Sequence, residues 1–403
     1  MTTVACNVPL EELVGRIGKL RQAMDEGGID GALIVQKTDL YYFSGTSQQA
    51  WLYLPREGAP LLMVFKEYER ARQESPLSEI ISIVGVKNIP RVLADYGYPQ
   101  PGVLGLELDV LPVNLYLQYA KIFAGARLVD LSTEIRLVRA VKSEFELAKM
   151  KAAAVRADLV AARAAEVVAA GKTEVALAGE LEGYARSLGH QGIVRMRMWN
   201  NELFYGHLMA GDGAAVPSYL ASPTGGVGVS GAIGQGAGMR VIGRREPILV
   251  DYVFALDGYL ADHTRIFALG PIDSRLQEAH QAMLDIQEEI RTFAWPGVSS
   301  GEIYERMVAR AGALNCADHF MGVGERRIRF TGHGIGLELD EFPFIAKGQT
   351  LPLSVGMVIA LEPKAIFPGL GVVGIENTHV VTAQGLQPLT LYPDAITILP
   401  EFG

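Results

Sequence analysis

The first 131 residues consist of short apolar runs separated by amphipathic stretches. Residues 10–28, LEELVGRIGKLRQAMDEGG, have helical periodicity and end in two glycines, which predicts a helix with a C-terminal stop. Apolar runs bounded by turn residues predict strands at 31–35, 59–65, 80–86, 103–108 and 126–130. Helices are expected between them at 90–97 and 112–123. This alternation of helices and strands predicts a self-contained α/β domain.

The pattern changes after Leu131, where the chain becomes more charged. An alanine-rich helix is expected at roughly 143–170, and a second helix at 173–189. We therefore expect the domain boundary within 132–142, and we divide the chain into residues 1–135 and 136–403.

The second part mixes strands and helices. Residues 246–270 predict a β-hairpin that turns at Asp257-Gly258, and residues 354–382 predict another pair of strands around a Pro/Gly loop. Helices are expected at 273–295 and 300–314. The glycine-rich stretch 225–238 lacks the Lys-Ser/Thr of a phosphate loop, and we interpret it as a rim of the functional site.

Composition narrows the possible partners. The chain has 403 residues, which fits two or three domains, and is 49% hydrophobic and 20% charged with a net charge of −9. Since no run of Lys and Arg stands out, nucleic acid and anionic membranes are not expected partners. Cys6 and Cys316 do not make a disulfide framework. With no recognisable signal peptide or membrane-spanning stretch, we expect a soluble cytoplasmic protein.

Two aspartates fall on one face of the first predicted hairpin. If Asp257-Gly258 is a two-residue turn, Asp262 lies opposite Val253, and Asp251 shares the face of Val253. The two aspartates are then diagonal neighbours, about 7–8 Å apart at the backbone. A lone aspartate in a strand usually faces solvent, but the apolar flanks here argue against exposure.

Two glutamates are related in the same way in the second pair of strands. Glu362 and Glu376 are placed symmetrically about Gly369, which makes them direct cross-strand partners if no bulge intervenes. His333 lies between glycines in FTGHGIG, and taken alone such a histidine is more often a turn residue than a ligand. Four carboxylates repel one another unless cations lie among them. With His333 they suit two divalent ions, chosen from Mn²⁺, Co²⁺, Fe²⁺ and Zn²⁺ rather than a thiolate-type zinc site.

At these residues the chain resembles the pita-bread metallopeptidase family, in its creatinase, prolidase and Xaa-Pro aminopeptidase branch. The family's metal pattern of two aspartates eleven residues apart, a histidine in a GHG and two glutamates is matched at every position. The matching residues are Asp251, Asp262, His333, Glu362 and Glu376. The resemblance implies an α/β N-terminal domain followed by an α+β pita-bread catalytic domain, and a homodimer.

Four positions depart from the peptidases of that family. Where they usually carry a second histidine, seven residues after the metal histidine, this chain has Asp340. A histidine often found four residues before the metal histidine is replaced by Arg329. Gln235 or a neighbouring residue replaces a third histidine of those peptidases. Gly374 occupies the position where they commonly have an arginine. We expect these substitutions to affect the choice of substrate and the rate of reaction more than metal binding.

The resemblance implies metal-dependent hydrolysis of an N-terminal peptide bond, Xaa-Pro being the expected substrate, by a dinuclear centre and a bridging hydroxide, with Mn²⁺ as the preferred ion. Glu362 is the expected proton acceptor. Asp340, if protonated, and His207 are the candidates to replace the lost catalytic histidines, and Arg329 and Gln235 are candidate substrate-binding residues. Purely structural roles stay open for three of these residues. Asp340 could cap a helix or turn, Arg329 could form a surface ion pair, and His207 could be a hydrogen-bonded core or loop histidine.

Two other functions fit the same pattern. One is a non-peptidase C–N hydrolase or lyase of the creatinase kind, favoured by the lost histidines. The other is a catalytically inactive binding module, which a complete ligand set argues against. His263 is expected to point to the other face of its strand from Asp262. We interpret the remaining histidines as structural: His190, His280, His319 and His379.

Overall fold

A computed structural model describes residues 8–220 and 222–402 of the chain. The described chain divides into two compact units, which end and begin at Arg139 and Ala140, whereas we expected the division at residue 135. Cys6 lies outside the described residues, and Cys316 is a free, half-buried thiol. None of the helices in the described ranges combines the length and the apolar character that crossing a membrane requires.

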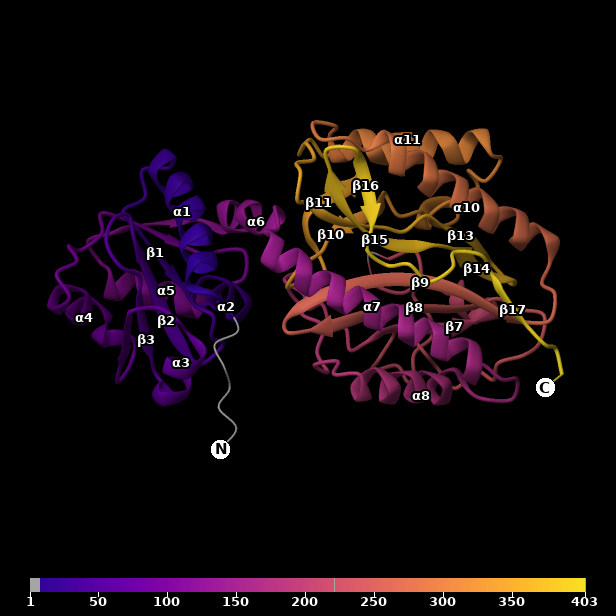
Figure 1. Ribbon diagram of the computed structural model, residues 1–403, viewed down its shortest axis with the longest axis horizontal. Helices are drawn as coiled ribbons and strands as arrows, with labels where there is room; N and C mark the ends of the chain where they lie inside the picture. The colour runs from indigo at the N-terminus through magenta and orange to yellow at the C-terminus, as the bar shows by residue number, and fades with distance from the viewer. Residues whose placement is uncertain (1–7, 221, 403) are drawn as a thin grey trace. The chain divides into compact units, whose positions relative to one another are not determined.

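The first unit contains a six-stranded sheet in the order β4-β3-β2-β1-β5-β6 (Figure 1). Its strands are β1 Gly31–Ile34, β2 Ala50–Pro55, β3 Leu61–Val64, β4 Glu79–Ser82, β5 Val103–Leu106 and β6 Arg127–Asp130. Its helices are α1 Leu10–Glu26, α2 Lys37–Ser44, α3 Tyr68–Glu74, α4 Ile89–Asp95 and α5 Val113–Ile122, with a 3-10 turn η1 at Val86–Asn88, and α6 Ser132–Ala140 follows them.

The five strands that the apolar runs predict are all present, and β2 is an additional one. β2 joins β1 to β3 through antiparallel pairs, while β3-β4, β1-β5 and β5-β6 are parallel. Tyr53 of β2 is buried in the core of this sheet. We did not predict this short strand, although Ser44-Gly45 before it and Gly58 after it are turn signals.

The second unit is built around a nine-stranded sheet. Seven strands form the order β11-β10-β12-β15-β9-β8-β7, while β16 pairs with β15 and β17 with β9. They are β7 Gly206–Ala210, β8 Ile248–Leu256, β9 Tyr259–Leu269, β10 Phe330–Gly334, β11 Glu341–Ala346, β12 Val358–Leu361, β15 Glu376–Thr382, β16 Gly385–Pro388 and β17 Thr397–Leu399. A separate two-stranded sheet pairs β13 Lys364–Phe367 with β14 Gly371–Gly374.

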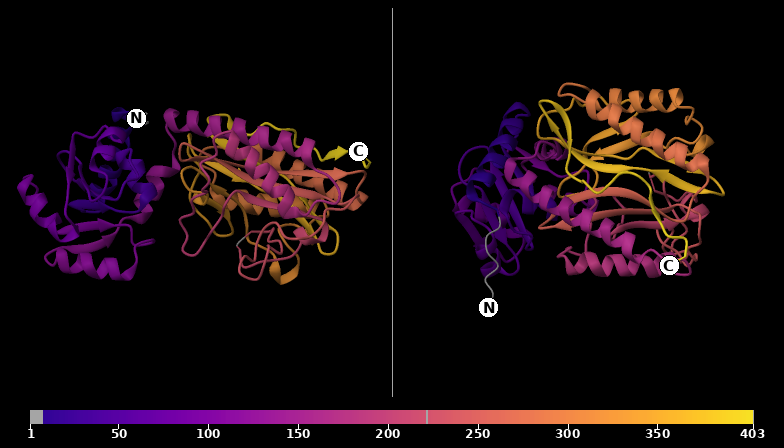
Figure 2. Two further views of the ribbon diagram at one scale, coloured as in Figure 1. Left: turned by 90° about the horizontal axis from the view of Figure 1, so that it is seen from below. Right: turned by 45° about the vertical axis from the view of Figure 1, so that its right-hand side comes forward.

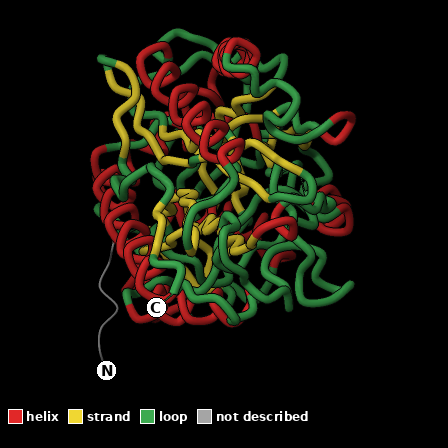
Figure 3. The backbone as a smooth tube through the Cα atoms, turned by 90° about the vertical axis from the view of Figure 1, so that its right-hand side faces the viewer, coloured by secondary structure: helices red, strands yellow, loops and turns green. Residues whose placement is uncertain are grey.

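Helices flank the strands of this unit (Figure 3). They are α7 Glu144–Val167, α8 Glu174–Ser187, the short α9 Gly211–Ala214, α10 Ser274–Phe293 and α11 Ser300–Ala313, with a 3-10 turn η2 at Gly324–Arg326. Helix α7 runs along β8 and β9 on one side of the sheet (Figure 2). It begins at a capping box in which Ser143 and Glu146 satisfy each other's backbone amides. The four helices predicted for the second unit are all present, each within a few residues of its expected ends.

The predicted hairpin at Asp257-Gly258 is confirmed. Leu256 pairs with Tyr259 and Val253 with Asp262, which is the register that a two-residue turn dictates. Asp257 and Gly258 both have positive φ, 51° and 90°, as a type I′ turn requires. The hairpin therefore places Asp251 and Asp262 on one face of the sheet.

His379 of β15 gives the fold a specific pH dependence. Burial lowers the pKa of this imidazole to about 4, while its ring bonds the backbone carbonyl of Asn377 at 2.9 Å. The unfolded chain therefore binds a proton between about pH 6.5 and 4 that the folded chain does not bind. We expect the free energy of unfolding to fall by about 2–3 kcal/mol from this residue alone between pH 7 and pH 4.5.

Urea unfolding of the wild type and of His379→Gln at both pH values measures this contribution. The variant is expected to lose about 2–3 kcal/mol less than the wild type on acidification, whatever its stability at pH 7. An equal loss in the two proteins would contradict the assignment of a neutral imidazole at this position.

Candidate metal centre

The five expected ligands come together on one face of the nine-stranded sheet. Asp251 and Asp262 come from β8 and β9, His333 from β10, and Glu376 from the first position of β15. Glu362 follows the end of β12. All except Asp251 are buried to 5% exposure or less, so their charges are removed from water and need partners inside the protein.

Glu362 and Glu376 stand opposite each other at a break between two ladders. Leu361 pairs with Asn377 in one ladder and Lys364 with Gly374 in the next. The register is the same on both sides of the break, as predicted, but the strands are not continuous through it. The two glutamates therefore lie opposite each other between the end of the β12-β15 ladder and the start of the β13-β14 ladder.

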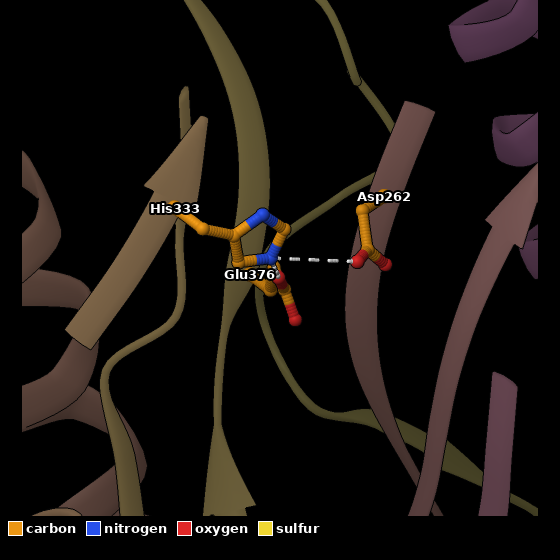
Figure 4. Close-up of side chains that lie close together, drawn as sticks. All are labelled: Asp262, His333 and Glu376. Carbon is orange, nitrogen blue, oxygen red and sulfur yellow. Dashed lines mark ion pairs between the residues drawn. The ribbon is translucent and has the colours of Figure 1, made fainter. Parts of the chain in front are cut away.

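Three of the five form a compact group that can hold an ion. Asp262, His333 and Glu376 each offer one ligand atom, and these atoms lie within 4.8 Å of one another. His333 Nε2 is 3.8 Å from Glu376 Oε1 and 4.0 Å from Asp262 Oδ2, and the three side chains converge in Figure 4. The Nδ1 atom of the same ring lies 3.0 Å from the carbonyl oxygen of Gly334, and in the neutral tautomer that donates to this carbonyl, Nε2 has the lone pair that a metal needs.

The charges of this group are costly without a cation. Burial, with the nearby charge of Glu376, raises the pKa of Asp262 well above its usual range. Burial also raises the pKa of Glu376 to about 7, although the charge of Lys364 opposes the shift. Asp262 Oδ1 is buried and has no hydrogen-bond partner among the described residues. A divalent ion bound by this carboxylate would offset the cost of its desolvation, so the residues fit a metal at this place.

Lys364 is the charged residue of this cluster to which sequence reasoning gave no role. Its Nζ lies 2.8 Å from Glu362 Oε2, 3.0 Å from Glu376 Oε2 and 3.0 Å from Asp251 Oδ2. Burial acts to lower the pKa of Lys364, but the three carboxylates outweigh it and raise the pKa well above its usual value. The signal was present, since a residue two positions after Glu362 in an extended chain shares its face.

Lys364 counts against the two-ion centre that the sequence predicts. The ammonium lies among the carboxylates that the second ion would need. One ion fits the group of Asp262, His333 and Glu376, and the second remains a prediction against which Lys364 counts.

His207 and Gln235 lie beside this cluster. His207 faces Asp251 across the β7-β8 ladder, and its Nε2 donates to Gln235 Oε1 at 3.3 Å. Gln235 Nε2 donates in turn to the backbone carbonyl of Glu202 at 2.8 Å. Burial lowers the pKa of His207, so the ring is neutral near pH 7. Gly236 of the glycine-rich loop lies against this ring, because a Cβ there would be 3.3 Å from His207 Cδ2.

The structure separates the roles of the acidic pair at 340–341. Asp340 is half-buried, and its charge is the strongest of those that raise the pKa of His333 against the effect of burial. Glu341 turns away to Lys142, whose Nζ lies 2.9 Å from Glu341 Oε2. Asp340 therefore lies close enough to His333 to act on its charge, while Glu341 has a structural partner.

Arg329 is the one candidate that the described residues do not connect to the cluster. Its side chain is exposed, and no hydrogen bond or ion pair joins it to the five expected ligands within the described ranges. Burial raises the pKa of Tyr304 on α11, and the nearby charge of Arg329 counteracts that shift. Its proposed contact with a substrate stays a prediction.

The other histidines have partners away from the cluster. His263 points to the opposite face of β9, where its Nδ1 lies 3.8 Å from Asp158 Oδ1 of α7, as expected from the alternation of a strand. The remaining four each bond a backbone carbonyl, which fits the structural role expected for His190, His280, His319 and His379.

Two threonines that the sequence did not predict as site residues form hydrogen bonds to the site's acidic residues. Thr264 Oγ1 donates to Glu376 Oε2 at 3.0 Å. Thr378 Oγ1 accepts from the backbone amide of Asp262 at 2.9 Å and donates to its carbonyl oxygen at 2.8 Å. Sequence alone gave no reason to select them, since threonine is a common residue in strands.

Comparisons with known proteins agree with this geometry. Residues 148–383 match the model of metallopeptidase family M24, and residues 16–141 match the creatinase/prolidase N-terminal domain. The chain is 27% identical to a Xaa-Pro dipeptidase of Pyrococcus furiosus, over 93% of this chain and 97% of that protein. It is also 27% identical to a Xaa-Pro dipeptidase of Lactobacillus delbrueckii, over 95% of this chain and 99% of that protein.

Solved structures share the fold over nearly the whole chain. A Xaa-Pro dipeptidase from Bacillus anthracis superimposes with a TM-score of 0.82 at 24% identity, covering 96% of this chain and all of that one. The prolidase from Pyrococcus horikoshii gives a TM-score of 0.79 at 24% identity, covering 94% of this chain and 99% of that one. The expected α/β domain followed by a pita-bread domain is confirmed.

Proposed function

Since the chain belongs to metallopeptidase family M24, we propose that it hydrolyses the bond between an N-terminal residue and a following proline in short peptides. The observation that carries the proposal is the buried group of Asp262, His333 and Glu376, whose ligand atoms converge on one place. The Xaa-Pro dipeptidases that resemble this chain along almost all of their length support the choice of substrate.

A divalent ion held by Asp262, His333 and Glu376 would act as a Lewis acid toward the scissile carbonyl and increase the acidity of water. Mn²⁺ is our proposed ion, because oxygen ligands with one imidazole suit it. The bridging hydroxide expected from the sequence depends on a second ion and is not part of the proposal.

The chain's own residues supply the proton transfers and the positioning. Glu362 lies beside the metal group, and we assign it the transfer of a proton from water to the proline nitrogen that leaves. The Lys364 ammonium, 2.8 Å from Glu362 Oε2, fixes the orientation of this carboxylate. His207 is neutral and buried next to Asp251, and its one N–H donates to Gln235 Oε1, so we assign it the positioning of Gln235, a candidate substrate-binding residue.

Asp340 and Arg329 complete the assignment as hypotheses. Asp340 is near enough to His333 to affect its pKa, which supports a role at the sequence position where the related peptidases usually carry a histidine. Arg329 is exposed, which suits the capture of a substrate carboxylate arriving from solvent. A homodimer and a cytoplasmic location stay predictions. The alternative of a creatinase-like C–N hydrolase rests on the lost histidines alone, and the relatives reported above do not favour it.

The test is hydrolysis of a panel of Xaa-Pro dipeptides, longer Xaa-Pro peptides and matched Xaa-Ala peptides by protein loaded with Mn²⁺. We expect cleavage of the Xaa-Pro substrates, loss of activity after chelation by EDTA, and recovery when Mn²⁺ is restored. Cleavage that survives complete removal of metal would contradict a metallopeptidase mechanism. A metal-loaded protein that cleaves creatine-like compounds but no peptide would establish the alternative.

A further inference from the structure

Lys364 has the surroundings of a bound cation. Its ammonium carries three donor hydrogens, and three carboxylates lie within 3.0 Å of its nitrogen. These carboxylates belong to Asp251, Glu362 and Glu376, which come from separate segments of the chain. The lysine is buried to 1% exposure, so its donor hydrogens are directed to these carboxylates rather than to bulk water.

The backbone holds Lys364 at this place. It opens β13, where it pairs with Gly374 of β14, and its backbone carbonyl accepts from the amide of Met321 at 2.9 Å. Gly374 has φ 150°, and a Cβ there would lie 2.7 Å from Lys364 Cα and 3.0 Å from its Cγ. The absence of a side chain at 374 therefore leaves room for the lysine stem to run into the acidic cluster.

Glu376 divides its two oxygens between two cation positions. Oε2 lies 3.0 Å from Lys364 Nζ, while Oε1 lies 3.8 Å from His333 Nε2, on the side of the metal group. A carboxylate that bridges two metal ions is arranged in this way, one oxygen to each ion. Here one of the two positions is filled by a covalently attached ammonium.

The charges also favour a single ion. One ammonium and one divalent ion bring three positive charges to the four carboxylates and leave one negative charge. Two divalent ions besides the ammonium would bring five positive charges to these four carboxylates and crowd the cations together in a buried site.

We propose that the Lys364 ammonium permanently takes the place of the second metal ion, so that each chain binds one divalent ion, at Asp262, His333 and Glu376. The inference rests on the metal-binding part of the proposed function, and not on its substrate. Lys364 is then a positioning residue for Asp251 and Glu362. One metal ion and the fixed positive charge of Lys364 together take the places of two metal ions.

Metal content of the full-length protein tests the proposal directly. Protein stripped with EDTA, reloaded with Mn²⁺ and freed of excess metal is analysed for bound Mn²⁺ per chain and by electron paramagnetic resonance. We expect one ion per chain and the spectrum of isolated Mn²⁺. Two ions per chain with an exchange-coupled spectrum would overturn the proposal. No bound ion would overturn both this proposal and the metallopeptidase function, whereas one ion without peptidase activity would overturn the function alone.

The variant Lys364→Ala opens the second position. We expect its metal content to rise from one to two ions per chain, with the appearance of exchange coupling. Lys149→Ala is the matched control, because that lysine pairs with Asp257 at the surface and should leave the content at one. A folded Lys364→Ala protein that still binds one ion would overturn the role of the ammonium, and if the variant fails to fold, the wild-type ratio decides.

Discussion

The variant His333→Ala is expected to lose Xaa-Pro hydrolysis by about a thousandfold in kcat/KM, because a metal contributes several kcal/mol to stabilising the transition state. His333 supplies the only nitrogen of the metal group, and the ring is held by its Nδ1 contact with the carbonyl of Gly334. Its removal leaves two carboxylates to hold the ion. Steady-state kinetics and calorimetric titration with Mn²⁺ measure the two effects.

Metal affinity should fall together with activity. Loss of a residue that only supports a ligand costs about 10–100-fold in affinity, so loss of the ligand itself is expected to cost more than that. His319→Ala is the matched control, because its imidazole is half-buried against Phe367 and bonds the carbonyl of Ile366, outside the cluster. We expect the control to keep its metal affinity and its kcat/KM within a few fold. A His333→Ala protein that behaves like the control would show that the group of three does not hold the metal.

Much of the site follows from the sequence because strand geometry is strict. The turn at Asp257-Gly258 fixes the register of β8 and β9, and the register fixes the face of Asp251 and Asp262. The even spacing of Glu362 and Glu376 placed them opposite each other in the same way. Local rules of this kind do not depend on the rest of the chain, so the acidic cluster could be predicted before the fold was known.

The positions of His207 and Lys364 depend on contacts that no local rule supplies. His207 reaches Asp251 because β7 pairs with β8, although residues 211–247, of which the structure describes all but 221, lie between the two strands. Lys364 reaches the cluster because β13 leaves the main sheet after Glu362 and pairs with β14 instead. Alternation along the chain indicated the correct face for Lys364, but not that its nitrogen would contact three carboxylates.

Glu341, the second member of the acidic pair after His333, is expected to act through stability. Its Oε2 lies 2.9 Å from Lys142 Nζ, and both side chains are almost fully buried. Its Oε1 accepts from the backbone amides of Leu337 at 2.9 Å and Glu338 at 3.2 Å, which shapes the loop between β10 and β11. The glutamate thereby joins the segment before α7 to the loop that follows the metal histidine.

The variant Glu341→Gln keeps an oxygen for the two amides but removes the negative charge. Lys142 then remains buried with a backbone carbonyl, that of Ala140, and a neutral amide in place of a carboxylate. Breaking a buried ion pair in this way costs about 3–5 kcal/mol, which for a unit of this size lowers Tm by about 10 °C. Thermal unfolding followed by circular dichroism at pH 7 measures the loss.

Two further variants separate the buried charge from other effects of the substitution. Asp257→Asn breaks the exposed pair with Lys149, whose side chains are 28% and 43% exposed, and should cost less than about 1 kcal/mol. The double variant Lys142→Met/Glu341→Gln removes both charges and should recover most of the loss, because the cost arises from a buried ammonium without its carboxylate. If Glu341→Gln is no less stable than Asp257→Asn, the pair does not stabilise the loop, and Glu341 would have to be tested as a second acidic residue of the catalytic site.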